Sequence, residues 1–118
     1  MTHTDGTVLC YLRTHRRVWG LTQQELAALL GFESAAHVSR IENGKRAPTI
    51  ESAFACQAIF GIAPSEMFPH AYDLVEERVV RDIYQRHLAL SDTTKPSELR
   101  KRELFELVLD RAVSSPNS

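Results

Sequence analysis

Apolar residues recur at helical spacing through the first 68 positions, and capping residues and glycines divide them into five segments. Thr22 with Glu25 three residues later forms the capping-box pattern that begins a helix. Gly20, Gly31 and Gly61 follow apolar segments, where glycine commonly ends a helix. The pattern predicts helices at 8–19, 22–30, 34–43, 50–60 and 64–68. No strand-like alternation of useful length occurs in the sequence.

The first three predicted helices each carry an apolar stripe that should face the interior. In the third, Val38 and Ile41 lie one turn apart, and Ser34 is placed as the N-cap. We expect these stripes to meet in a core that contains Val8, Leu9, Leu12, Trp19, Leu26, Leu29, Leu30, Val38 and Ile41. The sequence therefore predicts an all-α fold with a five-helix domain at residues 8–68.

Two longer amphipathic helices are predicted after Pro69, at 72–90 and 96–113. In the first of them we expect the inward positions to be Leu74, Val75, Val79, Ile83 and Leu90. An amphipathic helix must bury its apolar stripe against another surface. Residues 69–118 are therefore predicted to be a helical extension that packs on the five-helix domain or on a second subunit.

Composition and charge fit a soluble globular protein. Of 118 residues, 43% are hydrophobic and 25% are charged, and the net charge is -1. Residues 1–50 carry six Lys or Arg against four Asp or Glu, whereas 51–118 carry eight against eleven, so the first half is the likelier side to face an anion. The sequence has no apolar run of the roughly 20 residues that span a bilayer, and MTHTDGT is not a signal peptide. We expect a cytoplasmic location with no membrane partner, and buried thiols at Cys10 and Cys56.

No catalytic or metal-binding pattern stands out in the sequence. His3, His15, His70 and His87 lack metal-ligand spacing, and no Ser-His-Asp order or phosphate loop is present. We therefore expect neither an enzyme nor a metal or cofactor site.

Three sequence blocks carry a family resemblance: LTQQELAALLG at 21–31, SRIENGKRAPT at 39–49 and FGIAPSEMF at 60–68. With these blocks in this order, residues 9–68 resemble the Cro-type, lambda-repressor-like helix-turn-helix domain of the XRE family of transcription regulators. The resemblance implies a five-helix domain whose second and third helices form the motif. It also implies a sequence-specific DNA-binding regulator, for which we favour repression, that places helix 35–43 in the major groove of double-stranded DNA.

The predicted groove helix supplies few strong base-reading side chains. Arg40 is the best candidate, because its fork can bind guanine bidentately, although a phosphate clamp is the alternative. Ala35 and Ala36 can offer only close approach or a thymine-methyl contact. The other residues expected on this face are Ser39, Asn43 and His37, and His37 can equally be a partly exposed flank residue.

Phosphate contacts are predicted at two places beside this helix. Gln23 and Gln24 lie in the first turn of the second helix, where unpaired backbone N–H groups and the dipole favour anions. The resemblance implies that Gln23 holds a phosphate. Lys45 and Arg46 directly follow the third helix and are expected to contact the DNA backbone, which positions the protein without specifying sequence.

Two further features concern structure. Arg16 falls on the apolar stripe of the first helix and needs a partner, and the resemblance pairs it with Glu42 in a salt bridge. Phe32 and Glu33 lie between Gly31 and Ser34, where the family's turn usually has a single residue. This insertion is expected to shift the start of the third helix by up to about 3.3–3.6 Å.

Residues 69–118 leave two functional hypotheses open. A homodimer, with these helices contributing, suits a motif whose dimers bind half-sites about one DNA turn apart; a monomeric seven-helix bundle is the alternative. The second hypothesis is a protein-interaction module, such as an antitoxin or adaptor, that binds another protein through the same helices.

Overall fold

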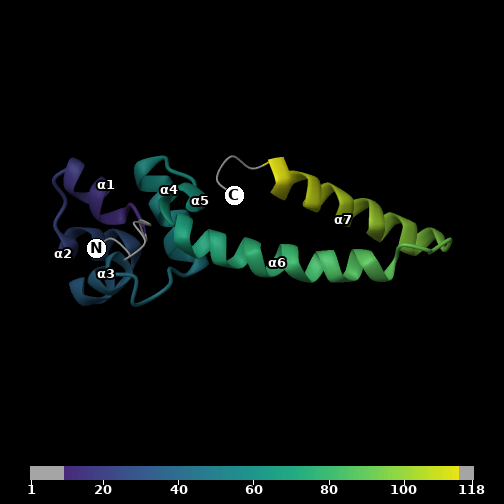
Figure 1. The fold of residues 1–118 in the computed structure, drawn as a ribbon. Helices are drawn as coiled ribbons and strands as arrows, with labels where there is room; N and C mark the ends of the chain where they lie inside the picture. The colour runs from purple at the N-terminus through teal and green to yellow at the C-terminus, as the bar shows by residue number, and fades with distance from the viewer. Residues whose placement is uncertain (1–9, 115–118) are drawn as a thin grey trace. The chain divides into compact units, whose positions relative to one another are not determined.

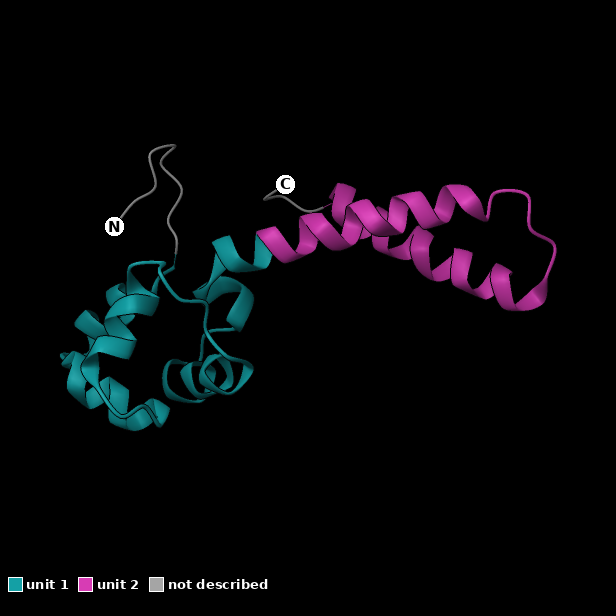
Figure 2. Ribbon diagram, turned by 90° about the horizontal axis from the view of Figure 1, so that it is seen from below, with its two compact units in different colours: residues 1–73 teal, residues 74–118 magenta. Residues whose placement is uncertain are grey.

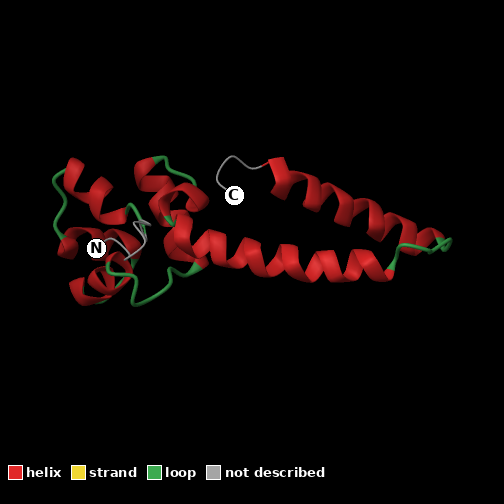
Figure 3. Cartoon of the chain, in the orientation of Figure 1, coloured by secondary structure: helices red, strands yellow, loops and turns green. Residues whose placement is uncertain are grey.

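A computed structural model describes residues 10–114 of the chain. The described residues form seven helices and no strand (Figures 1 and 3), which confirms the all-α prediction. The helices are α1 (Leu12–Val18), α2 (Gln23–Leu30), α3 (Ala35–Glu42), α4 (Ile50–Phe60), α5 (Pro64–Met67), α6 (Pro69–Ala89) and α7 (Pro96–Ser114).

The chain divides into two compact units, residues 1–73 and residues 74–118 (Figure 2). The division lies inside α6, which begins at Pro69, three residues before the predicted start at Tyr72. Proline is accepted there because the first helical position needs no backbone N–H donor.

Local signals explain where α2 ends and begins. Thr22 Oγ1 accepts from the Glu25 backbone N–H at 3.0 Å, and the Glu25 carboxylate accepts from the Thr22 N–H at 2.9 Å, so the predicted capping box is present. Gly31 ends the helix with φ +80°, in the left-handed region that favours glycine.

The helix α3 begins at the predicted place and with the predicted N-cap residue. Ser34 is its N-cap residue, yet no cap hydrogen bond involves the Ser34 side chain. Its carbonyl instead accepts from the His37 N–H at 3.2 Å. The predicted start of the first helix at Val8 lies outside the described residues; within them α1 begins at Leu12, with Tyr11 as its N-cap.

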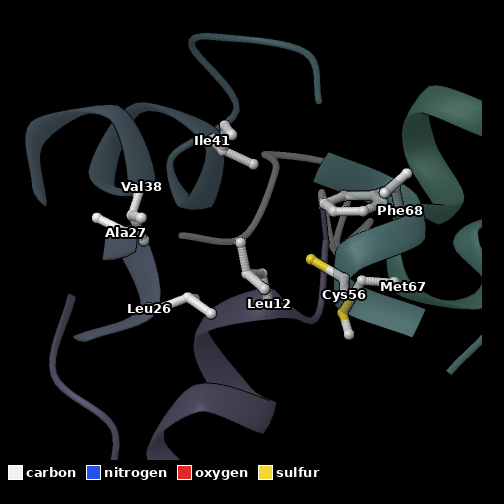
Figure 4. Packing of buried hydrophobic residues seen from close by; sticks show 9 residues of the cluster. Leu12, Leu26, Ala27, Val38, Ile41, Cys56, Met67 and Phe68 are labelled. Carbon is white, nitrogen blue, oxygen red and sulfur yellow. The ribbon is translucent and has the colours of Figure 1, made fainter. Parts of the chain in front are cut away.

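The core of the first unit is small and is drawn from five helices and the residue after α5 (Figure 4). It comprises Leu12, Leu26, Ala27, Val38, Ile41, Ala53, Cys56, Met67 and Phe68. Burial raises the pKa of the Cys56 thiol to about 11, so this thiol stays protonated at neutral pH. Cys10 is half-buried.

The predicted core was right at Leu12, Leu26, Val38 and Ile41 and wrong at two positions. The side chain of Trp19 is 70% exposed, because α1 ends at Val18 and the helical phase that placed Trp19 inward ends with it. Leu29 is 55% exposed because α2 packs through Leu26 and Ala27 instead. Leu30 packs at the edge of the core. Val8 and Leu9 lie outside the described residues.

The second unit contains two long helices that bury none of their described residues. Leu74 and Val75, predicted to face inward, are 56% and 53% exposed. Val79, Ile83 and Leu90 are half-buried. The contacts that join α6 to α7 include a 3.2 Å pair between His87 Nε2 and the Glu106 carboxylate, and that pair is exposed.

Candidate nucleic-acid interface

The helices α2 and α3 pack on each other more extensively than any other pair of helices in the described chain. Leu26 and Ala27 from α2 meet Val38 and Ile41 from α3 in the core, and all four side chains are buried. The Phe32 N–H donates to the Ala27 carbonyl at 2.8 Å and closes the C-terminal end of α2. The shared core of Leu26, Ala27, Val38 and Ile41 joins the two helices.

The opposite side of α3 is open to solvent. Ala36 and Arg40 are exposed, and Ala35, His37 and Ser39 are half-buried. This is the face that the sequence analysis predicted for DNA contact. Arg40 is its only exposed charged side chain within α3.

Asn43, also predicted on this face, is committed to other protein groups. Its Oδ1 accepts from Arg13 Nη2 at 2.6 Å, and its Nδ2 donates to Ser39 Oγ at 3.3 Å. These two bonds hold the Asn43 amide in place and leave its second N–H and second oxygen lone pair for another partner. The same pair of bonds restrains Ser39 and holds the end of α3 to α1.

Glu42 is the centre of a buried polar network. Arg16 donates to its two carboxylate oxygens at 2.6 and 3.1 Å, which is the ion pair expected between these residues. Gln23 Nε2 adds a hydrogen bond of 3.0 Å, and Arg13 Nε adds one of 3.4 Å. A further Arg16 nitrogen donates to the Leu21 carbonyl at 3.0 Å. The network joins α1, α2 and α3 behind the solvent-facing side of α3.

The charge of Glu42 is well compensated. Burial acts to raise the pKa of this carboxyl group, but hydrogen bonds from Arg16 and Gln23 outweigh it and hold the pKa below its usual range. Among the described residues, every buried side-chain nitrogen and oxygen has a hydrogen-bond partner. The network is therefore a rigid structural element of the kind that keeps a binding surface in one conformation.

Sequence reasoning found the Arg16–Glu42 pair but missed Arg13 and Gln23 as partners of the same carboxylate. The signal for Arg13 was its position, three residues before Arg16 and hence on the same side of the first helix. Gln23 gave no local signal for this contact, since Glu42 lies 19 residues away.

The start of α2 offers backbone donors to a ligand. The capping box satisfies the Glu25 N–H, and the first helical positions before it are Gln23 and Gln24, whose N–H groups have no partner within the helix. Gln24 is exposed, and Gln23 is half-buried because its side chain reaches toward Glu42. The geometry thus presents backbone N–H groups at Gln23 and Gln24 to an anion.

The loop after α3 is folded back onto the end of that helix. Gly44 has φ +73°, and the backbone N–H groups of Lys45 and Arg46 both donate to the Arg40 carbonyl, at 2.8 and 3.3 Å. The side chains of Arg40, Lys45 and Arg46 are all exposed. We call these three residues the basic edge.

His37 lies beside the basic edge and is held against the turn. Its ring stacks on Phe32 with a centroid distance of 3.8 Å and an interplanar angle of 14°. Loss of solvent contact, followed by the charges of Arg46 and Arg40, lowers the pKa of His37 below its usual range, so the imidazole is neutral at pH 7. Both residues stand out in the sequence, but no pattern in it pairs them.

Comparison with protein families identifies the scaffold. Residues 20–67, from just after α1 through α5, match the helix-turn-helix family (HTH_3). Residues 20–67 are a helix-turn-helix domain of the XRE and Cro type. Such a domain implies DNA binding, and its family typically has no catalytic activity. The match stops before α6 and α7.

The comparisons with curated proteins and with solved structures found no match to the chain. Within residues 10–114, no group of three His, Cys, Asp or Glu side chains is arranged to hold a metal ion. In the same residues, no helix has the length and apolar character needed to cross a membrane.

Proposed function

We propose that this protein is a sequence-specific transcription regulator that places α3 in the major groove of double-stranded DNA and acts as a repressor in the cytoplasm. The observation that carries the proposal is the position of the basic edge. Arg40, Lys45 and Arg46 are exposed at the end of the helix-turn-helix, and the Lys45 and Arg46 backbone is bonded to α3. Lysine and arginine side chains that contact DNA phosphates supply the sequence-independent part of DNA affinity.

The proposed contacts divide into two kinds. Arg40 reads a base edge, with Ala35, Ala36, His37 and Ser39 close to the groove floor. Lys45, Arg46 and the N–H groups of Gln23 and Gln24 bind phosphates. The Gln23 and Asn43 side chains are held in position by Glu42 and Arg13, and the second N–H of each amide can contact the DNA as well.

The salt dependence of DNA binding tests the phosphate role of the loop. In the double variant Lys45→Ala, Arg46→Ala, the slope of log K against log salt should become shallower by up to about 1.8 for two lost contacts, and affinity should fall on every DNA sequence. The matched control is Arg100→Ala, Lys101→Ala, which removes the same two charge types from exposed positions on α7. An unchanged slope in the first variant would reject the role of the loop.

We further propose that the active species is a homodimer in which a second copy covers the apolar side chains of α6 and α7. Leu88, Leu104 and Leu107 are each at least 50% exposed, and these two helices bury none of their described residues. A second copy is the occupant that suits the motif, because dimers read two half-sites roughly 34–36 Å apart.

Light scattering on the wild-type protein and on two leucine variants tests the proposed dimer. Leu107→Asp should raise the dimer dissociation constant by about tenfold or more, because a charge replaces an apolar side chain that the proposed dimer buries. Leu29→Asp, at a position with nearly the same exposure (55% against 54%), should leave it unchanged. A wild-type chain that stays monomeric at high micromolar concentration would overturn the dimer.

The competing function is a protein-interaction module, such as an antitoxin or adaptor, that uses residues 69–118. The same exposed leucines favour it, because they would suit another protein equally well. A monomeric chain that retains one stoichiometric, different protein through these residues would establish this alternative. The helix-turn-helix domain could still bind DNA in that case.

A further inference from the structure

Phe32 lies in the turn between α2 and α3 and is not among the residues proposed to contact DNA. Phe32 is half-buried and packs against the core, and its backbone N–H is bonded to Ala27. Its ring lies parallel to that of His37, one turn into α3, at a centroid distance of 3.8 Å. A side chain that is anchored in the core on one side and stacked on His37 on the other can fix the orientation of the imidazole.

The orientation of His37 matters because a neutral imidazole has one donor and one acceptor nitrogen. Major-groove base edges present distinct patterns of donors and acceptors, so a ring held in one orientation can distinguish them. The charged groups that act on His37 are Arg40, from its own helix, and Arg46, from the loop packed on that helix. Both are cations, and after the loss of solvent contact they contribute to the lowered pKa of His37.

We propose that Phe32 is a positioning residue for DNA recognition: by stacking on His37 it holds the imidazole so that His37 reads one base pair of each half-site. This inference rests on the proposed placement of α3 in the major groove. Phe32 itself touches no base. The stack thereby gives the turn between the two helices an indirect role in base recognition.

The stack can be tested first in the free protein by NMR. Stacking on a phenyl ring should shift the imidazole proton signals of His37 upfield, and Phe32→Leu should remove that shift while keeping an apolar side chain in the core. Phe32→Tyr should retain it. Wild-type protein without the upfield shift would overturn the inference, even if the protein binds DNA.

The second test measures base preference. Sites selected from random DNA by the wild-type protein are changed one base pair at a time, and affinities are measured at fixed salt and pH 7. His37→Ala should lose about 5- to 100-fold of discrimination at one base-pair position, with the other positions retained. Phe32→Leu should lose discrimination at that same position, and Phe32→Tyr should restore it. The double variant should be no worse there than His37→Ala alone.

The outcomes separate the two proposals. Wild-type protein that selects no DNA sequence would overturn the proposed function and this inference with it. Sequence selection that is unchanged in His37→Ala, or a uniform loss of affinity across all positions in Phe32→Leu, would overturn only the inference. In that last case Phe32 would have a purely structural role.

Discussion

The two units of this chain use the same kind of element in opposite ways. In the first, short helices bury nine apolar residues and the Arg16–Glu42 pair in a continuous interior. In the second, helices of 21 and 19 residues bury none of their described side chains, although α6 begins in the first unit. Helix length is therefore no guide to which part of the molecule is stabilised by its own packing.

The ion pairs show the same contrast. The Arg16 and Glu42 side chains are 9% and 0% exposed, whereas those of Arg81 and Glu77 on α6 are 66% and 67% exposed. A buried charge that loses its partner is costly, while an exposed pair gains little over hydration. The first unit thus depends on a specific buried pair of residues, whereas the exposed pair on α6 adds little to stability.

Truncation of a leucine in each unit should give the largest difference. Leu12 is fully buried, so Leu12→Ala should lower the free energy of unfolding by about 3–5 kcal/mol through lost contacts and a residual cavity. Leu107→Ala removes a side chain that is 54% exposed and should cost at most about 0.5 kcal/mol at concentrations where the chain is monomeric. Denaturant unfolding measures both. Equal losses would show that the second unit has a packed core of its own.

Removal of one arginine from each unit should give the next largest difference. Arg16→Ala leaves Glu42 in the interior without its main partner and should destabilise the fold by roughly 3 kcal/mol. Arg81→Ala removes the exposed partner of Glu77 and should cost about 0–1 kcal/mol. Thermal unfolding at low salt compares the two variants directly. An unchanged melting temperature in Arg16→Ala would contradict the structural role of the network.

The elements that sequence could predict are those set by neighbours in the chain. The Thr22–Glu25 capping box lies within one turn, and the spacing of Val38 and Ile41 identifies the inner face of α3. Trp19 was misplaced because a stripe drawn on an ideal helix does not show that the helix ends one residue earlier.

The candidate site was predictable in its list of residues but less so in their contacts. Gln23 was expected to hold a phosphate, and the sequence did not indicate that its side chain also donates to Glu42, 19 residues away. The Phe32–His37 stack depends on the path of a turn, which no periodicity describes. Non-local contacts of this kind are decided by tertiary packing.

Acidification should lower the stability of the first unit, but by less than Leu12→Ala or Arg16→Ala does. The pKa of Glu42 is lower in the folded protein than the value of about 4.3 expected when unfolded, so its contribution to stability is present above that pH and is lost as the pH falls through the folded value. Melting temperatures are measured between pH 6 and pH 3, and that of the wild type should decrease once the pH is below about 4. Glu42→Gln should start from a lower melting temperature and lack this component of the decline. If the two profiles are parallel, Glu42 is not the group whose protonation weakens the first unit, and the buried network does not make that unit acid-sensitive.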